Sequence, residues 1–215
     1  MNLKGMAAAL AAAFLIAGCA SVDVAPDASS ALTPNERLRL GAIYESKGEE
    51  DLALKEYKAL SREDAFNSDA YFALANLYLK REDYGEAEAN YKKAIEINPG
   101  EGTYHNNLGW LYMERGEFEA AAGEVKTALA RDPSRRYVYL DTLGVIQTRS
   151  RDYAGAEASL TEAAGLVPPD QTGGLVQIYT HLLELYGRTG ESSKAGEVER
   201  KLRELAGPGQ EGADE

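Results

Sequence analysis

The sequence predicts an all-α chain, built as a solenoid of about five helix-turn-helix repeats. Three observations predict it. Leucine, small and tyrosine positions recur with a period of 34 residues through the middle of the chain. Within each period the large residues are three or four positions apart, as on one face of a helix. Prolines close three of the periods, where they would end a helix. A plain antiparallel helical bundle, the main alternative, does not predict a fixed period of this length.

The chain opens with a segment of the secretory signal type. Lys4 is followed by an apolar, mostly alanine run from Met6 to Ala17, which is too short to span a bilayer as a mature helix. The only cysteine, Cys19, comes directly after Ile16-Ala17-Gly18. An ordinary signal peptide cut after Ala20 or beyond is the alternative. It would leave one unpaired reactive thiol in a secreted protein.

Residues 16–19 resemble the lipobox of bacterial lipoproteins. The resemblance implies a lipoprotein signal peptide at residues 1–18, removed before Cys19, and covalent lipid on Cys19. Several acyl chains on one residue anchor a protein firmly, because each buried methylene contributes about 0.8 kcal/mol. Ala20 and Ser21 directly follow Cys19, where an aspartate would imply retention at the inner membrane, so the resemblance implies a site at the periplasmic face of the outer membrane. Apart from this covalent lipid, we expect no cofactor.

The flanks of the repeats are small, polar and unpatterned. With the lipidated Cys19, residues 19–32 are expected to form a flexible tether, and residues 207–215 a disordered tail. Residues 33–206 then form the helical domain. The net charge of −12 argues against nucleic acid or an anionic lipid surface as a partner, since both need dense lysine and arginine.

The repeats are expected near residues 34–67, 68–101, 102–135, 137–170 and 176–206. The second repeat shows the pattern of both helices. Its first helix carries Leu74, Ala75 and Tyr78 on one face, and its second carries Ala87 and Ala94. Small residues on both helices allow a close approach of the pair, and the large ones fill the space between pairs.

Signals for helix ends fit this division. Thr33 to Glu36 reads as a capping box that starts the first repeat, with proline at the first helical position. Gly48, Gly116 and Gly190 fall at the turns inside their repeats. The fifth repeat follows a loop at 168–174 and departs from the pattern, as a terminal capping repeat does.

Over residues 34–206 this pattern resembles the tetratricopeptide repeat (TPR) family. The resemblance implies a right-handed superhelix whose first helices line a concave, partner-binding groove. Among the residues that map to the groove positions, eight are expected to bind the partner: Phe72, Asn76, Leu79, Asn106, Trp110, Met113, Asp141 and Val145. Aromatic, aliphatic and amide side chains suit a peptide groove, whereas a purely solvated face would be charged. The alternative is that the large apolar side chains pack on neighbouring repeats.

No residue pattern indicates catalysis, and we expect no enzyme activity, metal or small-molecule substrate. His105 occupies a position held by Tyr71 and Leu140 in other repeats, so it is expected to pack between helices. His181 stands alone next to Leu182. No histidine, cysteine or acid cluster has metal-ligand spacing.

Lipobox and TPR array together resemble the pilotin-type and Tad pilus-assembly lipoproteins. The resemblance implies a scaffold that binds protein or peptide segments during pilus or secretion-system assembly. The same architecture also resembles lipoproteins that recruit peptidoglycan hydrolases, and this adaptor function is the alternative. An enzyme accessory subunit is a more distant one.

Overall fold

The computed structural model describes residues 32–206. Within them lie ten α-helices, a short 3-10 helix and no strand. The helices are α1 (Pro34–Ser46), α2 (Glu50–Glu63), α3 (Ser68–Lys80), α4 (Tyr84–Ile97), α5 (Gly102–Glu114), α6 (Phe118–Arg131), η2 (Pro133–Arg135), α7 (Arg136–Arg149), α8 (Tyr153–Leu166), α9 (Thr172–Thr189) and α10 (Ser192–Ala206). None of these helices is long and apolar enough to cross a membrane. The expected signal segment, Cys19, most of the tether and the tail lie outside the described residues.

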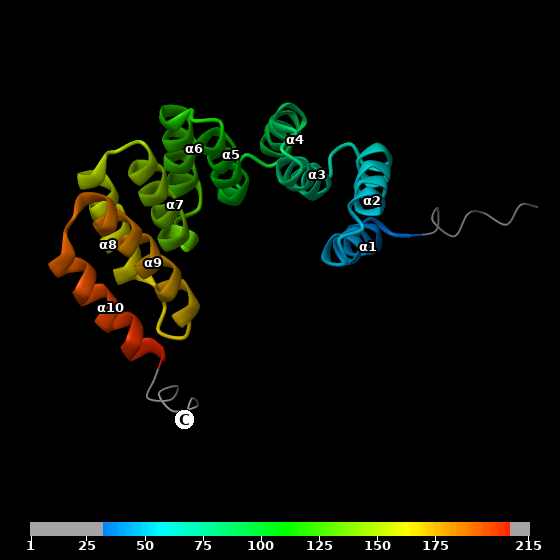
Figure 1. Ribbon diagram of the computed structural model, residues 1–215. Coiled ribbons are helices and arrows are strands. Elements are labelled where there is room, and N and C mark those ends of the chain that lie inside the picture. Colours follow the sequence, from blue (N-terminus) through cyan, green and yellow to red (C-terminus); the bar gives the residue numbers. More distant parts are fainter. Residues whose placement is uncertain (1–31, 207–215) are drawn as a thin grey trace, which may run out of the picture.

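Successive helices pair into five hairpins, which stack in chain order. The most extensive contacts are within the first four hairpins, from α1 with α2 to α7 with α8, and the fifth hairpin, α9 with α10, is less tightly packed. The first helices also approach one another, α3 with α5, α5 with α7 and α7 with α9. In Figure 1 the odd-numbered helices follow the inner side of an arc and the even-numbered helices its outer side. The predicted all-α solenoid is confirmed, and the first helices of the pairs form its concave face.

Small residues set the distance between paired helices, as the period predicts. Ala87 and Ala121 are fully buried. At Gly109 the approach is closer still, since an added Cβ would lie 2.7 Å from Val125 Cγ2. Thr33 and Glu36 form the expected capping box at the start of α1.

The buried apolar residues form two clusters that meet in α7. The main cluster runs from Ala53 on α2 to Ile146 on α7. The second cluster joins Leu140 of α7 to α8, α9 and α10, and ends at Val198.

The start of α9 differs from the expected position of the fifth repeat. The helix begins at Thr172 rather than near residue 176, so the end of the expected 168–174 loop is helical. This first turn lies against the start of α7. The Tyr137 hydroxyl donates a hydrogen bond to Gln171, and an added Cβ on Gly174 would lie 3.2 Å from the Tyr137 ring.

Each of the five hairpin turns contains one residue in the left-handed conformation. Gly48, Gly116 and Gly190 occupy three of them, with φ of 75°, 78° and 77°, as the sequence predicts. Glu82 and Arg151 hold the equivalent places, with φ of 60° and 67°. Two turns therefore use a residue that tolerates this conformation poorly.

Glu82→Gly or Arg151→Gly is expected to raise the free energy of unfolding by about 1 kcal/mol. The left-handed conformation costs a non-glycine residue about 1–2 kcal/mol, and the greater freedom of unfolded glycine offsets part of this. Urea unfolding would measure the change, with Gly116→Ala as the matched reverse variant that should lose stability. Equal stability of all three variants and the parent would show that these turns store no strain.

Candidate functional site on the concave face

The middle of the concave face is formed by α3 and α5. Four of the predicted groove residues are partly buried there and partly open to solvent: Phe72, Asn76, Leu79 and Trp110. The three apolar ones pack against the main cluster with the rest of their surface. The result is a mixed aromatic, aliphatic and amide surface held on two rigid helices.

The Phe72 ring is held by two tyrosines. Its centroid lies 4.8 Å from that of Tyr104 and 5.9 Å from that of Tyr91. The Tyr104 hydroxyl donates to Asp69 Oδ1 at 2.8 Å. Burial raises the pKa of Tyr104 to about 12, so the hydroxyl remains a donor at neutral pH. This part of the surface is therefore fixed before any partner binds.

Three asparagines join α3 to α5 beside these rings. Asn76 Oδ1 accepts from the Tyr91 hydroxyl at 2.5 Å and from Asn107 Nδ2 at 3.0 Å. Asn106 Nδ2 donates to Asn107 Oδ1 at 3.4 Å, while Asn106 Oδ1 is buried without a partner. Asn107 was not among the expected groove residues. The sequence carried no signal for it, because the equivalent positions of other repeats hold unrelated residues, Ala73 and Thr142.

Four of the expected groove residues are buried: Asn106 and Asp141, each 6% exposed, and two apolar residues of the core. Met113 is 2% exposed and Val145 is 8% exposed, and both lie in the main cluster. The expectation that their side chains line the groove is wrong. In mid-solenoid, α5 and α7 each contact the second helix of their own pair and helices of both neighbouring pairs. They therefore bury a wider arc of their surface than the leucine stripe indicates.

Asp141 is also buried, and it joins two repeats. Its Oδ1 lies 2.7 Å from His181 Nδ1, and its Oδ2 accepts from Gln177 Nε2 at 3.2 Å. Asp141 therefore links α7 to α9, and His181 is not the isolated residue that the sequence suggested. His105 packs between helices as expected, with Nδ1 2.8 Å from Glu124 Oε2.

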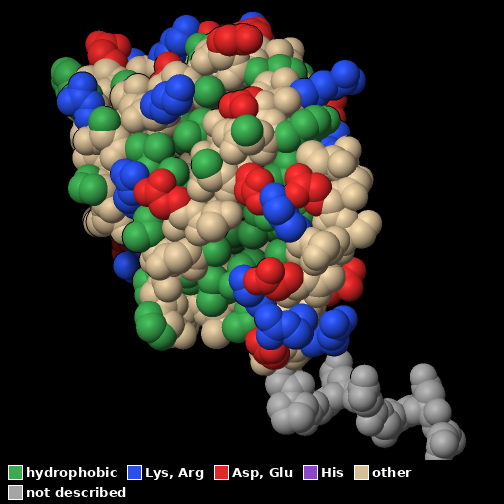
Figure 2. Space-filling view, turned by 90° about the vertical axis from the view of Figure 1, so that its left-hand side faces the viewer, with side chains coloured by type: hydrophobic (Ala, Val, Ile, Leu, Met, Phe, Trp, Pro, Cys, Tyr) green, Lys and Arg blue, Asp and Glu red, His purple; other side chains and the backbone are tan. Residues whose placement is uncertain are grey.

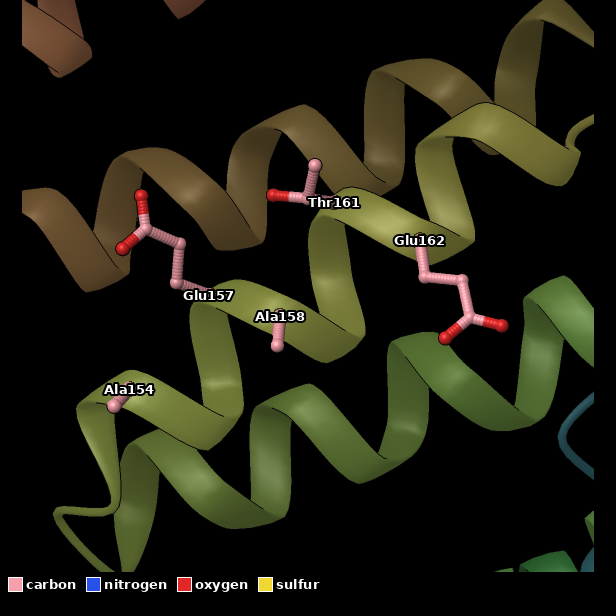
Figure 3. A pocket seen from close by; sticks show the side chains of 5 residues that line it. All are labelled: Ala154, Glu157, Ala158, Thr161 and Glu162. Atoms are coloured by element: carbon pink, nitrogen blue, oxygen red, sulfur yellow. The ribbon is translucent and has the colours of Figure 1, made fainter.

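A shallow hollow lies on the outer side of the solenoid, along α8. Its lining side chains all project from that helix (Figure 3): Ala154, Glu157, Ala158, Thr161 and Glu162. Both carboxylates already have partners. Glu157 binds Lys194 at 2.6 Å, and Glu162 binds Arg136 at 2.7 Å.

The outer surface near α8 and α10 shows intermixed charges. Figure 2 views this side of the molecule, where acidic and basic side chains alternate and apolar ones show between them. In residues 32–206, no group of three or more histidine, cysteine or acidic residues could hold a metal ion. The concave surface of α3 and α5 is therefore the better candidate for a binding site.

Comparisons with known proteins agree with this geometry. Family models described as tetratricopeptide repeat match residues 68–101 and 106–171. The general transcriptional corepressor trfA of Dictyostelium discoideum is 27% identical over 129 residues, which are 58% of this chain. The matched part is 9% of that relative's length.

Two solved structures share the fold over most of the chain. PilW, described as a widely conserved type IV pilus biogenesis factor, has a TM-score of 0.71 at 19% identity, over 82% of this chain and 79% of that one. PilF of Pseudomonas aeruginosa has a TM-score of 0.70 at 18% identity, over 85% of this chain and 80% of that one. At these identities the likeness shows the fold alone.

Proposed function

Because the chain is an all-α solenoid of tetratricopeptide repeats, a scaffold for protein–protein interaction, we propose that it is a lipid-anchored scaffold for envelope assembly. The groove of Phe72, Asn76, Leu79 and Trp110 binds a protein segment rich in apolar and amide side chains. Cys19 carries the lipid anchor at the periplasmic face of the outer membrane. The envelope machinery that this scaffold helps to assemble is a pilus or a secretion system.

The observation that carries the proposal is the preformed surface of α3 and α5. The Phe72 ring is fixed by its contacts with two tyrosines, and Asn76 is fixed by hydrogen bonds. Binding of a partner therefore costs little entropy in ordering this part of the surface. Aromatic side chains at such a surface supply most of the binding free energy, and asparagine amides can pair with the backbone of an extended segment. The likeness to PilW and PilF favours pilus assembly over the adaptor alternative.

Anchoring can be tested through Cys19→Ser. The variant is expected to leave the outer-membrane fraction, because acyl chains would supply nearly all the membrane affinity of an acidic body. Cell fractionation with antibody detection measures this. A serine variant that remains with outer membranes as the parent does would contradict the lipid anchor.

Trp110→Ala is expected to cost about 2 kcal/mol of partner affinity, the scale of a buried aromatic at an interface. Trp110 is only partly buried, so the stability loss should stay well below the 3–5 kcal/mol of a fully buried tryptophan. Cross-linking in envelopes followed by mass spectrometry would identify the partners, and titration of each purified partner would give the affinity. Phe66→Ala is the control, because this aromatic is 83% exposed and lies outside the groove.

The identity of the cross-linked partners decides between the pilus-assembly scaffold and the hydrolase adaptor. The proposal is supported if pilus or secretion-channel subunits are cross-linked to the parent and are lost with the Trp110→Ala variant. Peptidoglycan hydrolases in their place would favour the adaptor alternative. Partners bound equally by both variants and the parent would place recognition outside this groove.

A further inference from the structure

The first helix of every later repeat packs against the preceding repeat, and it buries one apolar position that the first repeat leaves exposed. This position lies three residues after the core leucine, and its side chain is at most 1% exposed in four repeats: Leu77, Leu111, Ile146 and Leu185. The equivalent residue of the first repeat is Ile43, which is 49% exposed. The apolar surface that repeats bury against one another is thus open at the N-terminal end of the solenoid.

A carboxylate on the preceding repeat receives donors beside this position. Glu88, the fifth residue of α4, accepts from the Tyr112 hydroxyl at 3.0 Å and from Arg115 at 2.5 Å. Glu157, the fifth residue of α8, accepts from the Tyr186 hydroxyl at 2.9 Å and from Lys194 at 2.6 Å. A tyrosine and a cation therefore bind the same acid at two separate joints.

The first repeat presents the same donors without an acid. Tyr44 and Lys47 correspond in position to Tyr112 and Arg115. Within residues 32–206 neither side chain makes a hydrogen bond or ion pair. Leu52, the third residue of α2 as Lys194 is of α10, adds a second apolar side chain that is 42% exposed. We call Ile43, Tyr44, Lys47 and Leu52 the N-terminal end face.

The last helix of a second copy does not suit this face. The fifth residue of α10 is Gly196, which has no carboxylate. The carboxylates of α10 pair within the helix, as Glu204 does with Arg200 and Glu197 with Lys201. Head-to-tail stacking would therefore leave Tyr44 and Lys47 without an acid.

The stretch before α1 also lacks the pattern of a second helix. Asp23 and Pro26 precede Tyr57 and Leu60 by one period of 34 residues. If this stretch formed a second helix in the same register, Asp23 and Pro26 would place a charge and a helix breaker at positions where the second helices carry buried side chains. An amphipathic helix of another protein can supply both the acid and the apolar face that this surface lacks.

We propose that the N-terminal end face binds an amphipathic helix of a partner protein, completing the solenoid as a preceding repeat would. A carboxylate in the second turn of that helix binds Tyr44 and Lys47, and its apolar face covers Ile43 and Leu52. This surface is separate from the concave groove, so one molecule can hold two partners at once.

The chain itself supplies a probe. A fluorescent, helix-stabilised peptide with the sequence of residues 84–98 carries Glu88 in the required place. Anisotropy titration against the whole chain should show saturable binding, weakened about tenfold by Lys47→Glu and likewise by Ile43→Ser. The peptide with Glu88→Lys should bind the parent about tenfold more weakly and regain affinity for the Lys47→Glu chain. A surface that binds apolar peptides nonspecifically would not show this recovery of affinity when the two charges are exchanged.

Two controls keep the test specific. Lys126→Glu changes an exposed lysine on α6, far along the solenoid, and should leave the affinity unchanged. Trp110→Ala should do the same, which separates this face from the groove. Affinities of Ile43→Ser and Lys47→Glu equal to that of the parent would overturn the proposal, as would failure to saturate by about 1 mM peptide. Self-association of the parent that Ile43→Ser abolishes would also overturn it, because the occupant would then be a second copy.

Discussion

Arg37→Leu is expected to destabilise the first repeat by about 3–5 kcal/mol, the cost of leaving a buried carboxylate without its partner. Arg37 is 3% exposed, although it belongs to the first helix of the solenoid. Its guanidinium donates to Glu56 Oε2 at 2.7 Å and to Glu63 at 3.0 and 3.2 Å. Glu56 is itself 6% exposed, so the leucine variant would strand its charge inside the repeat.

Hydrogen exchange can locate this loss. Stability in a solenoid is carried by each repeat and its neighbours, so α1 and α2 should lose protection while α5 to α8 keep theirs. Arg37→Leu combined with Glu56→Leu should recover most of the loss, because no charge is then stranded. Arg39→Leu, on the exposed side of α1, is the control and should stay within about 0.5 kcal/mol of the parent. An Arg37→Leu chain as stable as that control would show that the ion pair contributes nothing net.

Gly109→Ala is expected to lower the free energy of unfolding by about 2–3 kcal/mol. The added methyl would lie 2.7 Å from Val125 Cγ2 and 3.0 Å from the Ala121 carbonyl oxygen. The second of these is helix backbone, which a rotamer change cannot move, so α5 and α6 must separate. Urea unfolding with an unchanged slope would report the loss.

Gly123→Ala is the matched control for this prediction. Gly123 lies on α6, and an added Cβ there would meet nothing within 4 Å. Alanine in that helix should stabilise the chain by about 0.5–1 kcal/mol through helix propensity. If both alanine variants gain stability, the contact between α5 and α6 yields easily and the small residue at position 109 is not required.

The solenoid could be predicted because its signal is repeated along the chain. Each period places leucine, a small residue and tyrosine on one helical face, and several periods reduce the weight of any single exception. The buried alanines and the turn glycines follow from the same spacing. The early start of α9 could not be predicted, because it depends on contacts of Tyr137 with Gln171 and Gly174 across two helices.

The candidate site could be predicted only in part. Spacing assigns a residue to one side of a helix, but it does not show how many neighbouring helices cover that side. Phe72 and Trp110 remained partly open, whereas Met113 and Val145 became core. The bond of Asp141 to His181 depends on the register between two repeats, which the insertion before the fifth repeat had obscured.

One pairing was within reach of the sequence. Arg37 and Glu56 are 19 residues apart, as are His105 and Glu124, and both pairs occupy the same two places in their repeats. A cation and an acid that recur together at equivalent positions indicate a contact between the paired helices. The uncharged residues that other repeats carry at the first place, Tyr71 and Leu140, conceal this equivalence.

The two apolar clusters meet within α7, so the division of the core does not coincide with the division of the sequence into repeats. The main cluster includes Tyr139, Leu143 and Ile146, while Leu140 of the same helix belongs to the second cluster. The fourth repeat therefore contributes to both clusters, and if each cluster unfolds as one cooperative unit, the boundary between the units runs along a helix. Thermal or chemical denaturation would open the chain from its two ends, with α7 the last segment to lose its structure.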